Sequence, residues 1–418
     1  MSLKSSGKVV ELHGRYGSFI MHPDFLVVGA GVIGISIALE LKRRFRDVKI
    51  TVIEKEEACA LHASGRNSGV LHAGFYYTAD SLKAKFTRDG NKLLTNYCDQ
   101  NNIPVNKCGK LVVAKDENEN ILIDELLSRG RKNGVNLEEL SVKEAQAIEP
   151  RIRTFERAIF SPTTSSVDPV KVVHSFENDA INEGVNFIYN AKYVKRKKKS
   201  VVTTKGEFEA DYVINSAGLY ADYIAKDFGF SEAYSILPFK GLYLYSDEPV
   251  GSIRTNIYPV PDLKNPFLGV HFTVTVDGRV KIGPTAIPAF WREQYEGASN
   301  FQAKEFVDIV RREIGLFASS NFGFMKLAVE EIRKYSRKRM VSLASTMVTG
   351  TNVCAFKRWA KPGIRAQLVN TKERRMEMDF VLEGDDKSMH VLNAVSPGFT
   401  CCIPFSKYIC DEIEKKLN

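Results

Sequence analysis

A glycine-rich turn near the start of the sequence constrains the fold more than any other feature. Four apolar residues, 25–28, predict a short buried strand. The turn Gly29-Ala30-Gly31-Val32-Ile33-Gly34 follows, and residues 35–45 predict a helix that ends in basic side chains. Residues 48–54 predict a second strand. Together they predict a β-α-β unit of a Rossmann-like α/β domain.

Each glycine of the turn has a separate physical task. Gly29 permits the tight turn, Gly31 lets the backbone approach a pyrophosphate, and Gly34 lets the helix pack on the strand. The positive end of the helix attracts phosphates. Glu54 follows at the end of the second strand, where a carboxylate accepts a hydrogen bond from a ribose and disfavours a 2′-phosphate. We therefore expect a dinucleotide site that does not take NADP; the alternative is a glycine turn of an unrelated α/β domain.

Composition excludes several classes of protein. With 44% hydrophobic and 26% charged residues among 418, the chain is not disordered, collagen-like or a coiled coil. A net charge of +9 favours acidic partners, and the densest basic cluster, residues 195–199, predicts a solvated hairpin rather than a nuclear signal or RNA-binding patch. Seven cysteines without C-x-x-C and seven histidines without H-x-x-x-H predict a reducing compartment and no metal site.

The remaining pattern alternates helical and extended segments. Residues 1–22 predict a polar tail without the apolar segment of a secretory signal, and no segment predicts a transmembrane helix. Between residues 237 and 284, short apolar runs at 242–245, 257–260, 267–272 and 279–282, separated by turn residues, predict an antiparallel sheet with Asp277-Gly278 as a hairpin turn. Other helices are expected at 81–101, 119–133, 141–150 with a capping box of Ser141 and Glu144, 169–183 with Asp168 as its N-cap, 302–313, 324–337 and from about 403, with strands at 110–114, 212–215 and within 363–395.

The choice between flavin and nicotinamide depends on a resemblance. After a long middle region the chain returns with a predicted strand at 212–215, followed by Ser216-Ala217-Gly218. This discontinuous layout resembles the two-domain flavin oxidoreductases of the glutathione-reductase-like class, in which the returning strand and its Ala-Gly close on the cofactor. The resemblance implies FAD.

Four further segments carry a more specific resemblance. Together with the glycine turn, the matching segments extend from about residue 24 to residue 415. They read GRNSGVLHAGFYY at 65–77, NIYPVPD at 256–262 with PFLGVHFT at 266–273, PGIRAQ at 362–367, and HVLNAVSP at 390–397. They resemble the L-2-hydroxyglutarate dehydrogenase/oxidase family, which belongs to the D-amino-acid-oxidase-like flavoproteins. The chain departs from the family pattern at Arg66, at Lys240 and Leu242, and in the bulkier residues 398–402.

The resemblance implies a division of the chain into two interleaved parts. The FAD-binding domain takes residues 23–80, 145–235 and 360–418, and an antiparallel-sheet substrate domain takes 81–144 and 236–359. The residues expected to hold FAD are Gly29, Ala30, Gly31, Val32, Ile33, Gly34, Glu54, Lys55, Asn67, Ser68, Gly69, Val70, Ala217, Gly218, Gly363, Ile364, Ser396, Pro397 and Gly398.

Oxidation of a 2-hydroxy acid moves a hydride from C2 to flavin N5 while the hydroxyl loses a proton. An imidazole suits the base, so His72 and then His271 are the candidates; the alternatives are a histidine bound to FAD and a core histidine. Arg365 can bind a carboxylate with two parallel bonds. Lys240 is a second candidate for a carboxylate, with an exposed lysine as the alternative. The hydroxyls of Tyr76, Tyr77 and Tyr258 are expected either to donate hydrogen bonds to the substrate or merely to pack.

The expected reaction is oxidation of L-2-hydroxyglutarate to 2-oxoglutarate. Two alternatives remain: a glycerol-3-phosphate dehydrogenase or amine/amino-acid oxidase of the same superfamily, and a non-enzymatic nucleotide- or RNA-binding protein. We expect no nucleic-acid partner and an electron acceptor that is oxygen, a quinone or an electron-transfer flavoprotein. The protein is expected inside the cell, in the cytoplasm or mitochondria, with a peripheral membrane contact as a further option.

Overall fold

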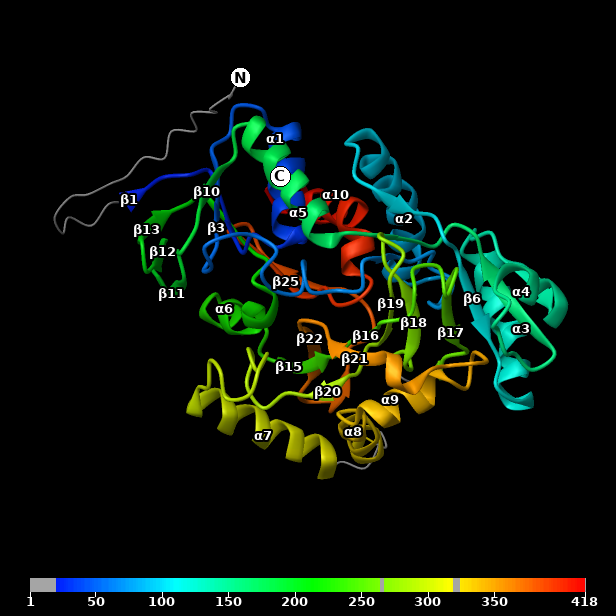
Figure 1. The fold of residues 1–418 in the computed structure, drawn as a ribbon. Helices are drawn as coiled ribbons and strands as arrows, with labels where there is room; N and C mark the ends of the chain where they lie inside the picture. The colour runs from blue at the N-terminus through cyan, green and yellow to red at the C-terminus, as the bar shows by residue number, and fades with distance from the viewer. Residues whose placement is uncertain (1–19, 264–266, 319–323, 418) are drawn as a thin grey trace, which may run out of the picture.

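A six-stranded sheet forms the centre of the layer that carries the glycine turn (Figure 1). The computed structural model describes residues 20–263, 267–318 and 324–417. The first five strands in the sheet order are parallel, and the sixth pairs antiparallel at the edge. In order they are β10 (Asn186–Ile188), β3 (Ile50–Ile53), β2 (Phe25–Val28), β14 (Tyr212–Asn215), β25 (Ser388–Asn393) and β24 (Val381–Gly384).

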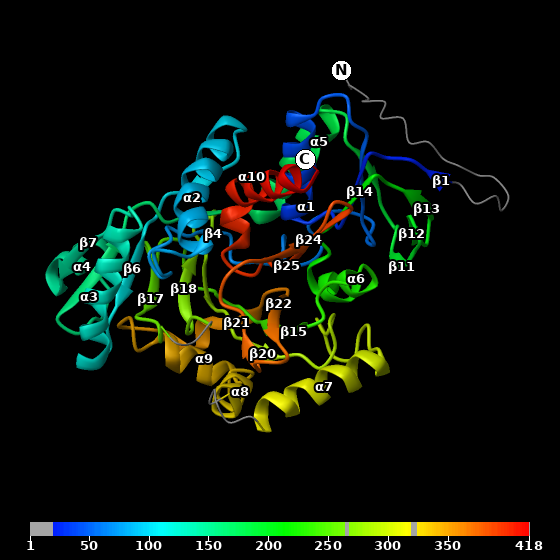
Figure 2. The same cartoon turned by 180° about the vertical axis from the view of Figure 1, so that it is seen from behind.

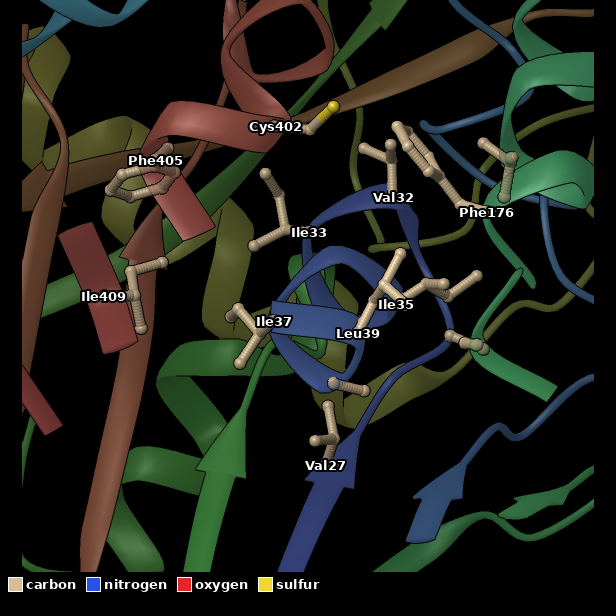
Figure 3. Close-up of a cluster of buried hydrophobic side chains, with 14 of the residues drawn as sticks. Val27, Val32, Ile33, Ile35, Ile37, Leu39, Phe176, Cys402, Phe405 and Ile409 are labelled. Carbon is tan, nitrogen blue, oxygen red and sulfur yellow. The ribbon is translucent and has the colours of Figure 1, made fainter. Parts of the chain in front are cut away.

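Strand β2 explains why the predicted run is apolar throughout. Phe25 and Val27 pack into a core with helices α1 (Val32–Arg44), α5 (Pro169–Asn182) and α10 (Gly398–Leu417), as Figure 3 shows around Val27. Leu26 and Val28 point to the other face. That face is covered by α6 (Ala221–Asp227) and a small sheet of β1 (Ile20–Met21), β11 (Tyr193–Lys197), β12 (Ser200–Thr203) and β13 (Gly206–Glu209).

The helix signals in the sequence are confirmed, with shifted starts. Helix α1 begins at Val32 rather than at residue 35, so the glycine turn runs directly into it. Asp168 caps α5, and Ser141 with Glu144 forms the predicted capping box of α4 (Val142–Ile148). Helix α10 begins at Gly398, not at 403.

A second layer contains an eight-stranded sheet. The predicted hairpin at Asp277-Gly278 joins two of its antiparallel strands, and Gly278 has φ +77° as such a turn requires. The order is β21 (Phe356–Trp359), β16 (Leu244–Ser246), β19 (Val280–Gly283), β18 (His271–Val274), β17 (Asn256–Pro259), β6 (Lys110–Val113), β8 (Arg157–Ser161) and β7 (Glu138–Ser141). The strand expected over 267–272 starts only at His271; residues 264–266 lie outside the described part of the chain.

Two small sheets connect the layers, and further helices surround the second one (Figure 2). One sheet holds β20 (Ile287–Pro288), β15 (Tyr234–Gly241), β22 (Gly363–Asn370) and β23 (Arg375–Met376); the other holds β4 (Val70–Leu71), β9 (Ser165–Val167) and β5 (Val105–Asn106). The helices are α3 (Glu117–Lys132), α7 (Ala303–Ala318), α8 (Phe324–Arg333) and α9 (Arg337–Ala344), while α2 (Leu82–Gln100) lies beside α10 in the first layer. The helix expected over 324–337 ends at Arg333, and a separate helix, α9, begins at Arg337. None of the described helices has the length and apolarity needed to cross a bilayer.

Three segments lie elsewhere than the expected division places them. Strand β8, expected in the cofactor part, pairs with β6 in the eight-stranded sheet. Helix α2, expected in the substrate part, buries Phe86 and Leu94 in the core around α1 and α10. Residues 20–21, expected in the tail, pair with β13, while 1–19 lie outside the described residues. An amphipathic pattern shows that a face is buried but not which element covers it. The basic residues 195–199 lie in the exposed β11–β12 hairpin, as predicted.

Candidate active site

A cavity of about 820 Å³ opens at the carboxyl ends of β2, β3, β14 and β25. This edge is where parallel α/β sheets bind ligands. The cavity is lined by most of the residues that the sequence selects for cofactor and substrate: Gly29, Ala30, Gly31, Val32, Ile33, Glu54, Lys55, Asn67, Ser68, Val70, His72, Ala217, Gly218, Gly363, Ile364, Arg365, Ser396, Pro397 and Gly398. Those that do not line it are Gly34, Gly69, Tyr76, Tyr77, Lys240, Tyr258 and His271.

The glycine turn forms an open cradle at one end of the cavity. Gly29 has φ +106°, and a Cβ there would lie 2.8 Å from the Ser216 carbonyl oxygen. The N-cap residue of α1 is Gly31, which has no side chain, and the Val32 N–H donates to the Ser64 Oγ at 2.9 Å. A Cβ on Gly31 would meet only the Ser64 Oγ, at 3.1 Å. The remaining N–H groups of the first turn and the space above Gly31 fit a pyrophosphate.

Glu54 is held in place by the backbone of the same turn. The Ala30 N–H donates to Oε2 at 2.9 Å, and the Glu56 N–H donates to Oε1 at 3.0 Å. Each carboxylate oxygen keeps a lone pair for a further donor. A ribose hydroxyl at this edge of the cavity is a fitting partner.

The segment from His62 to Gly69 forms the wall beside the cradle. The Asn67 side chain folds onto its own loop, donating to the Ser64 carbonyl at 2.7 Å and accepting from the Gly69 N–H at 2.8 Å. Gly69 has φ +77°, and a Cβ there would lie 2.3 Å from the Val167 carbonyl oxygen. Asn67 and Gly69 therefore shape the loop, while Ser68 and Val70 line the cavity.

The other end of the cavity brings β22 and the start of α10 together. A Cβ on Gly363 would lie 2.3 Å from the Arg66 carbonyl oxygen, so this glycine allows β22 to touch the loop that carries Arg66. Ser396, Pro397 and Gly398 lead into α10 from the end of β25. Backbone N–H groups at a helix start suit the carbonyl oxygens of a flavin ring.

His72 lies at this end, directly after β4. Its backbone N–H donates to the Thr400 Oγ1 at 3.2 Å, which ties it to α10. Its imidazole has no hydrogen-bond partner among the described residues and lines the cavity. Burial, with a smaller contribution from the Lys110 charge, lowers the pKa of His72 to about 3, so the neutral ring with a free nitrogen predominates at neutral pH.

Arg365 extends from β22 and also lines the cavity. Its Nη1 donates to the Thr285 carbonyl at 2.9 Å. Burial lowers the pKa of this guanidinium, which still remains a cation because its ordinary pKa is so high. The remaining N–H groups can take a carboxylate.

Lys240 and His271 lie elsewhere than the sequence suggests. In the β15–β22 pair Phe239 is opposite Arg365, so Lys240, one residue further on, points to the other face of the sheet. His271 stacks on Tyr258 with ring centroids 3.7 Å apart, and its Nδ1 lies 2.8 Å from the Gly269 carbonyl oxygen. Burial drives the pKa of His271 well below its ordinary value.

The site also contains residues that sequence reasoning missed. Tyr243 and Arg66 line the cavity, and the Arg66 guanidinium lies 4.2 Å from the centroid of the Tyr295 ring. Arg292 reaches the cavity wall and forms a buried ion pair with Asp222 at 2.7 Å. Arg66 lies in the segment 65–77 that the sequence analysis singles out, whereas no local motif surrounds Tyr243 or Arg292, and only the pairing of distant segments places those two here.

Two clusters of potential metal ligands occur in the described part of the chain, although the sequence predicts none. They are Cys59 with His174 and Glu177, and Glu56 with His62 and Glu293. The members of each already pair with neighbours: the Cys59 thiol donates to Glu177 at 3.1 Å, and His62 contacts Glu56 at 2.8 Å.

Comparisons with known proteins agree with this geometry. A model of the DAO family of FAD-dependent oxidoreductases matches residues 24–412. The L-2-hydroxyglutarate dehydrogenase of Escherichia coli K12 is 34% identical over 405 residues, covering 94% of each chain. The human mitochondrial L-2-hydroxyglutarate dehydrogenase is 35% identical over 418 residues, covering 94% of this chain and 89% of that one.

Solved structures share the fold at lower identity. The L-α-glycerophosphate oxidase of Mycoplasma pneumoniae, solved with FAD bound, superposes with a TM-score of 0.73 at 22% identity, covering 94% of this chain and 95% of that one. Glycine oxidase from Geobacillus kaustophilus gives 0.70 at 18% identity, covering 95% of both. The fold, the cradle for a dinucleotide and the family match together assign FAD as the cofactor. The chain belongs to the DAO family of FAD-dependent oxidoreductases, in the group of the L-2-hydroxyglutarate dehydrogenases.

Proposed function

We propose that the protein oxidises L-2-hydroxyglutarate to 2-oxoglutarate. The observation that carries the proposal is that His72 and Arg365, a neutral base and a cation, line the same cavity as the dinucleotide cradle. A 2-hydroxy acid offers each of them a partner. The names of the relatives at 34% and 35% identity support the same substrate.

In this proposal His72 removes the hydroxyl proton. Its imidazole lacks a protein partner and is neutral at physiological pH, so a nitrogen lone pair is available. When FAD is bound, its flavin ring supplies the acceptor for the hydride that leaves C2. The contact of His72 with Thr400 fixes the base relative to the start of α10, so the distance between proton acceptor and flavin end is set by the fold.

Arg365 binds the carboxylate next to the reacting carbon. Its position on a paired strand, with Nη1 held by the Thr285 carbonyl, leaves a guanidinium of fixed orientation. A carboxylate gains two parallel charge-assisted bonds from such a group. This anchors the carbon chain of the substrate relative to β22.

A test uses the protein's own colour. Anaerobic mixing with L-2-hydroxyglutarate should bleach the flavin absorbance within seconds, and the D-enantiomer should not. Rapid bleaching by glycerol 3-phosphate or by an amino acid, with none by L-2-hydroxyglutarate, would instead favour the other enzymes of the superfamily. A colourless protein that binds RNA with a steep salt dependence would favour the non-enzymatic alternative.

The electron acceptor and the cellular setting are further parts of the proposal. Oxygen, a quinone and an electron-transfer flavoprotein are the candidate acceptors, and the rate at which each reoxidises the bleached protein decides among them. We expect the protein inside the cell, in the cytoplasm or mitochondria. A peripheral membrane contact through α7 and α8 is supported by exposed Val307 and Ile332 close to basic Arg311 and Arg333. Sedimentation with anionic vesicles tests it.

A further inference from the structure

Lys110 is a buried cation that the mechanism above does not use. It is the first residue of β6 and has no exposed surface. Its Nζ has no hydrogen-bond partner among the described residues. Three aromatic rings surround the ammonium, with centroids 4.5 Å away for Phe75, 4.5 Å for Tyr76 and 4.9 Å for Tyr258.

Such an arrangement is costly unless a ligand completes it. Lysine side chains usually reach solvent or an acidic partner, and an unpaired buried charge strongly destabilises a fold. The aromatic faces offset only part of the lost hydration. Burial accordingly lowers the pKa of Lys110 to about 7, so the ammonium loses its proton more readily than that of an exposed lysine. A bound anion would stabilise the charged form.

The location of Lys110 links it to the substrate end of the cavity. Lys110 and Val112 project from one face of β6, toward the cluster that contains Ala73, Phe75 and Tyr258. His72 immediately precedes that cluster's Ala73. The Lys110 charge lowers the pKa of His72, and the charges of Lys110 and Arg365 both lower that of His271. Lys110 therefore acts on both imidazoles and shares one of them, His271, with Arg365.

Further unsatisfied polar groups lie in the same region. The Tyr76 hydroxyl and the Thr273 hydroxyl are buried without a hydrogen-bond partner among the described groups. Both are donors in the wall where Lys110 lacks an acceptor. What this wall lacks is an anionic acceptor, which a carboxylate would supply.

We propose that the Lys110 ammonium binds the distal carboxylate of the substrate and so selects dicarboxylic over monocarboxylic 2-hydroxy acids. The inference rests on the proposed function and deepens it. Lys110 takes the place that the sequence assigns to Lys240, which points away from Arg365. Lys110 and its three rings do not line the cavity, so the entering carboxylate displaces part of this aromatic wall and replaces a cation–π contact by an ion pair.

The test combines one substitution in the protein with one in the substrate. L-2-hydroxyglutarate and L-2-hydroxypentanoate have the same chain length, and only the first has a distal carboxylate. In Lys110→Met the efficiency of flavin reduction should fall ten- to a hundredfold with the dicarboxylate and by less than about threefold with the monocarboxylate. Lys83→Met is the matched control, because Lys83 of α2 is also buried, with its ammonium near the rings of Tyr77 and Phe380. This variant should leave the ratio of the two efficiencies unchanged.

An equal loss with both substrates, or an unchanged preference, would overturn the proposal. If Lys110→Met does not fold, the unmodified protein decides: glutarate should perturb the flavin spectrum at a concentration at least tenfold lower than pentanoate, and equal affinity refutes the subsite. Failure of the proposed function is distinguishable, because the unmodified protein would then not be bleached by either 2-hydroxy acid.

Discussion

Two glycines of the same turn should fail in different ways when each is replaced by alanine. A Cβ on Gly34 would lie 2.1 Å from the Gly29 carbonyl oxygen and 2.5 Å from the Ser216 Oγ. The first contact is with backbone, which cannot move without separating α1 from β2. Overpacking of this kind costs about 1–3 kcal/mol and at times more, and this contact lies at the severe end.

A Cβ on Gly31 meets far less resistance from the protein. Its only neighbour within range is the Ser64 Oγ at 3.1 Å, which a small side-chain shift relieves. The methyl group would instead occupy space that the pyrophosphate needs at the start of α1. Loss of one charge-assisted contact there is worth about 1.5–3 kcal/mol, which is roughly a ten- to hundredfold weaker FAD affinity.

Two measurements separate these effects. The ratio of flavin to protein absorbance after dialysis reports cofactor binding, and urea unfolding of the flavin-free proteins reports the free energy of the fold without the contribution of bound ligand. Gly31→Ala should lose flavin and keep the urea midpoint of the flavin-free parent, whereas Gly34→Ala should lower that midpoint. Full flavin occupancy in Gly31→Ala, or an unchanged midpoint in Gly34→Ala, would refute the reasoning.

Three further outcomes are expected. His72→Asn should slow flavin reduction about a hundredfold or more with nearly unchanged substrate affinity. Burial lowers the pKa of His72 to about 3 and the neutral form is the base, so flavin reduction by the unmodified protein should persist as the pH falls through the ordinary histidine range. Stopped-flow measurements of flavin reduction across this pH range check the prediction. Arg365→Lys should weaken substrate binding roughly ten- to a hundredfold in spectral titrations, since lysine lacks the two-pronged geometry; unchanged affinity removes Arg365 from the site. Asp222→Asn should cost about 3–5 kcal/mol in urea unfolding, because it leaves the buried Arg292 guanidinium without its anion, and a second change, Arg292→Met, should restore part of the loss.

The local parts of the fold could be predicted from the sequence. The β-α-β unit, the capping box of α4, the Asp168 cap of α5 and the hairpin at Asp277-Gly278 all depend on neighbouring residues, and the structure confirms them. Helix α1 starts three residues earlier than periodicity indicated because Val32 and Ile33, read as part of the turn, already have helical geometry.

The substrate end could be predicted only in part, because it is built by long-range pairing. His72 and Arg365 stand in recognisable motifs and do line the cavity. Lys110 begins a strand whose sequence, Lys-Leu-Val-Val, gives no sign that the lysine is buried, since burial comes from Phe75 and Tyr258 in distant segments. Lys240 was chosen by its charge, but the register of β15 with β22 decides where it points.

The position of α10 against α1 has a consequence for synthesis of the chain. Helix α1 is complete by residue 44, yet its apolar side is covered by a helix that begins at residue 398, beside a sheet that needs a strand from 388–393 (Figure 3). Translation of the roughly 350 residues between the two helices takes on the order of 20 to 70 seconds at cellular rates. During that time the first β-α-β unit leaves the ribosome with an exposed apolar surface, which chaperones recognise. A nascent polypeptide that stalls before residue 388 has an incomplete sheet and an incomplete cavity, so it is a target for proteolysis rather than an enzyme of reduced activity.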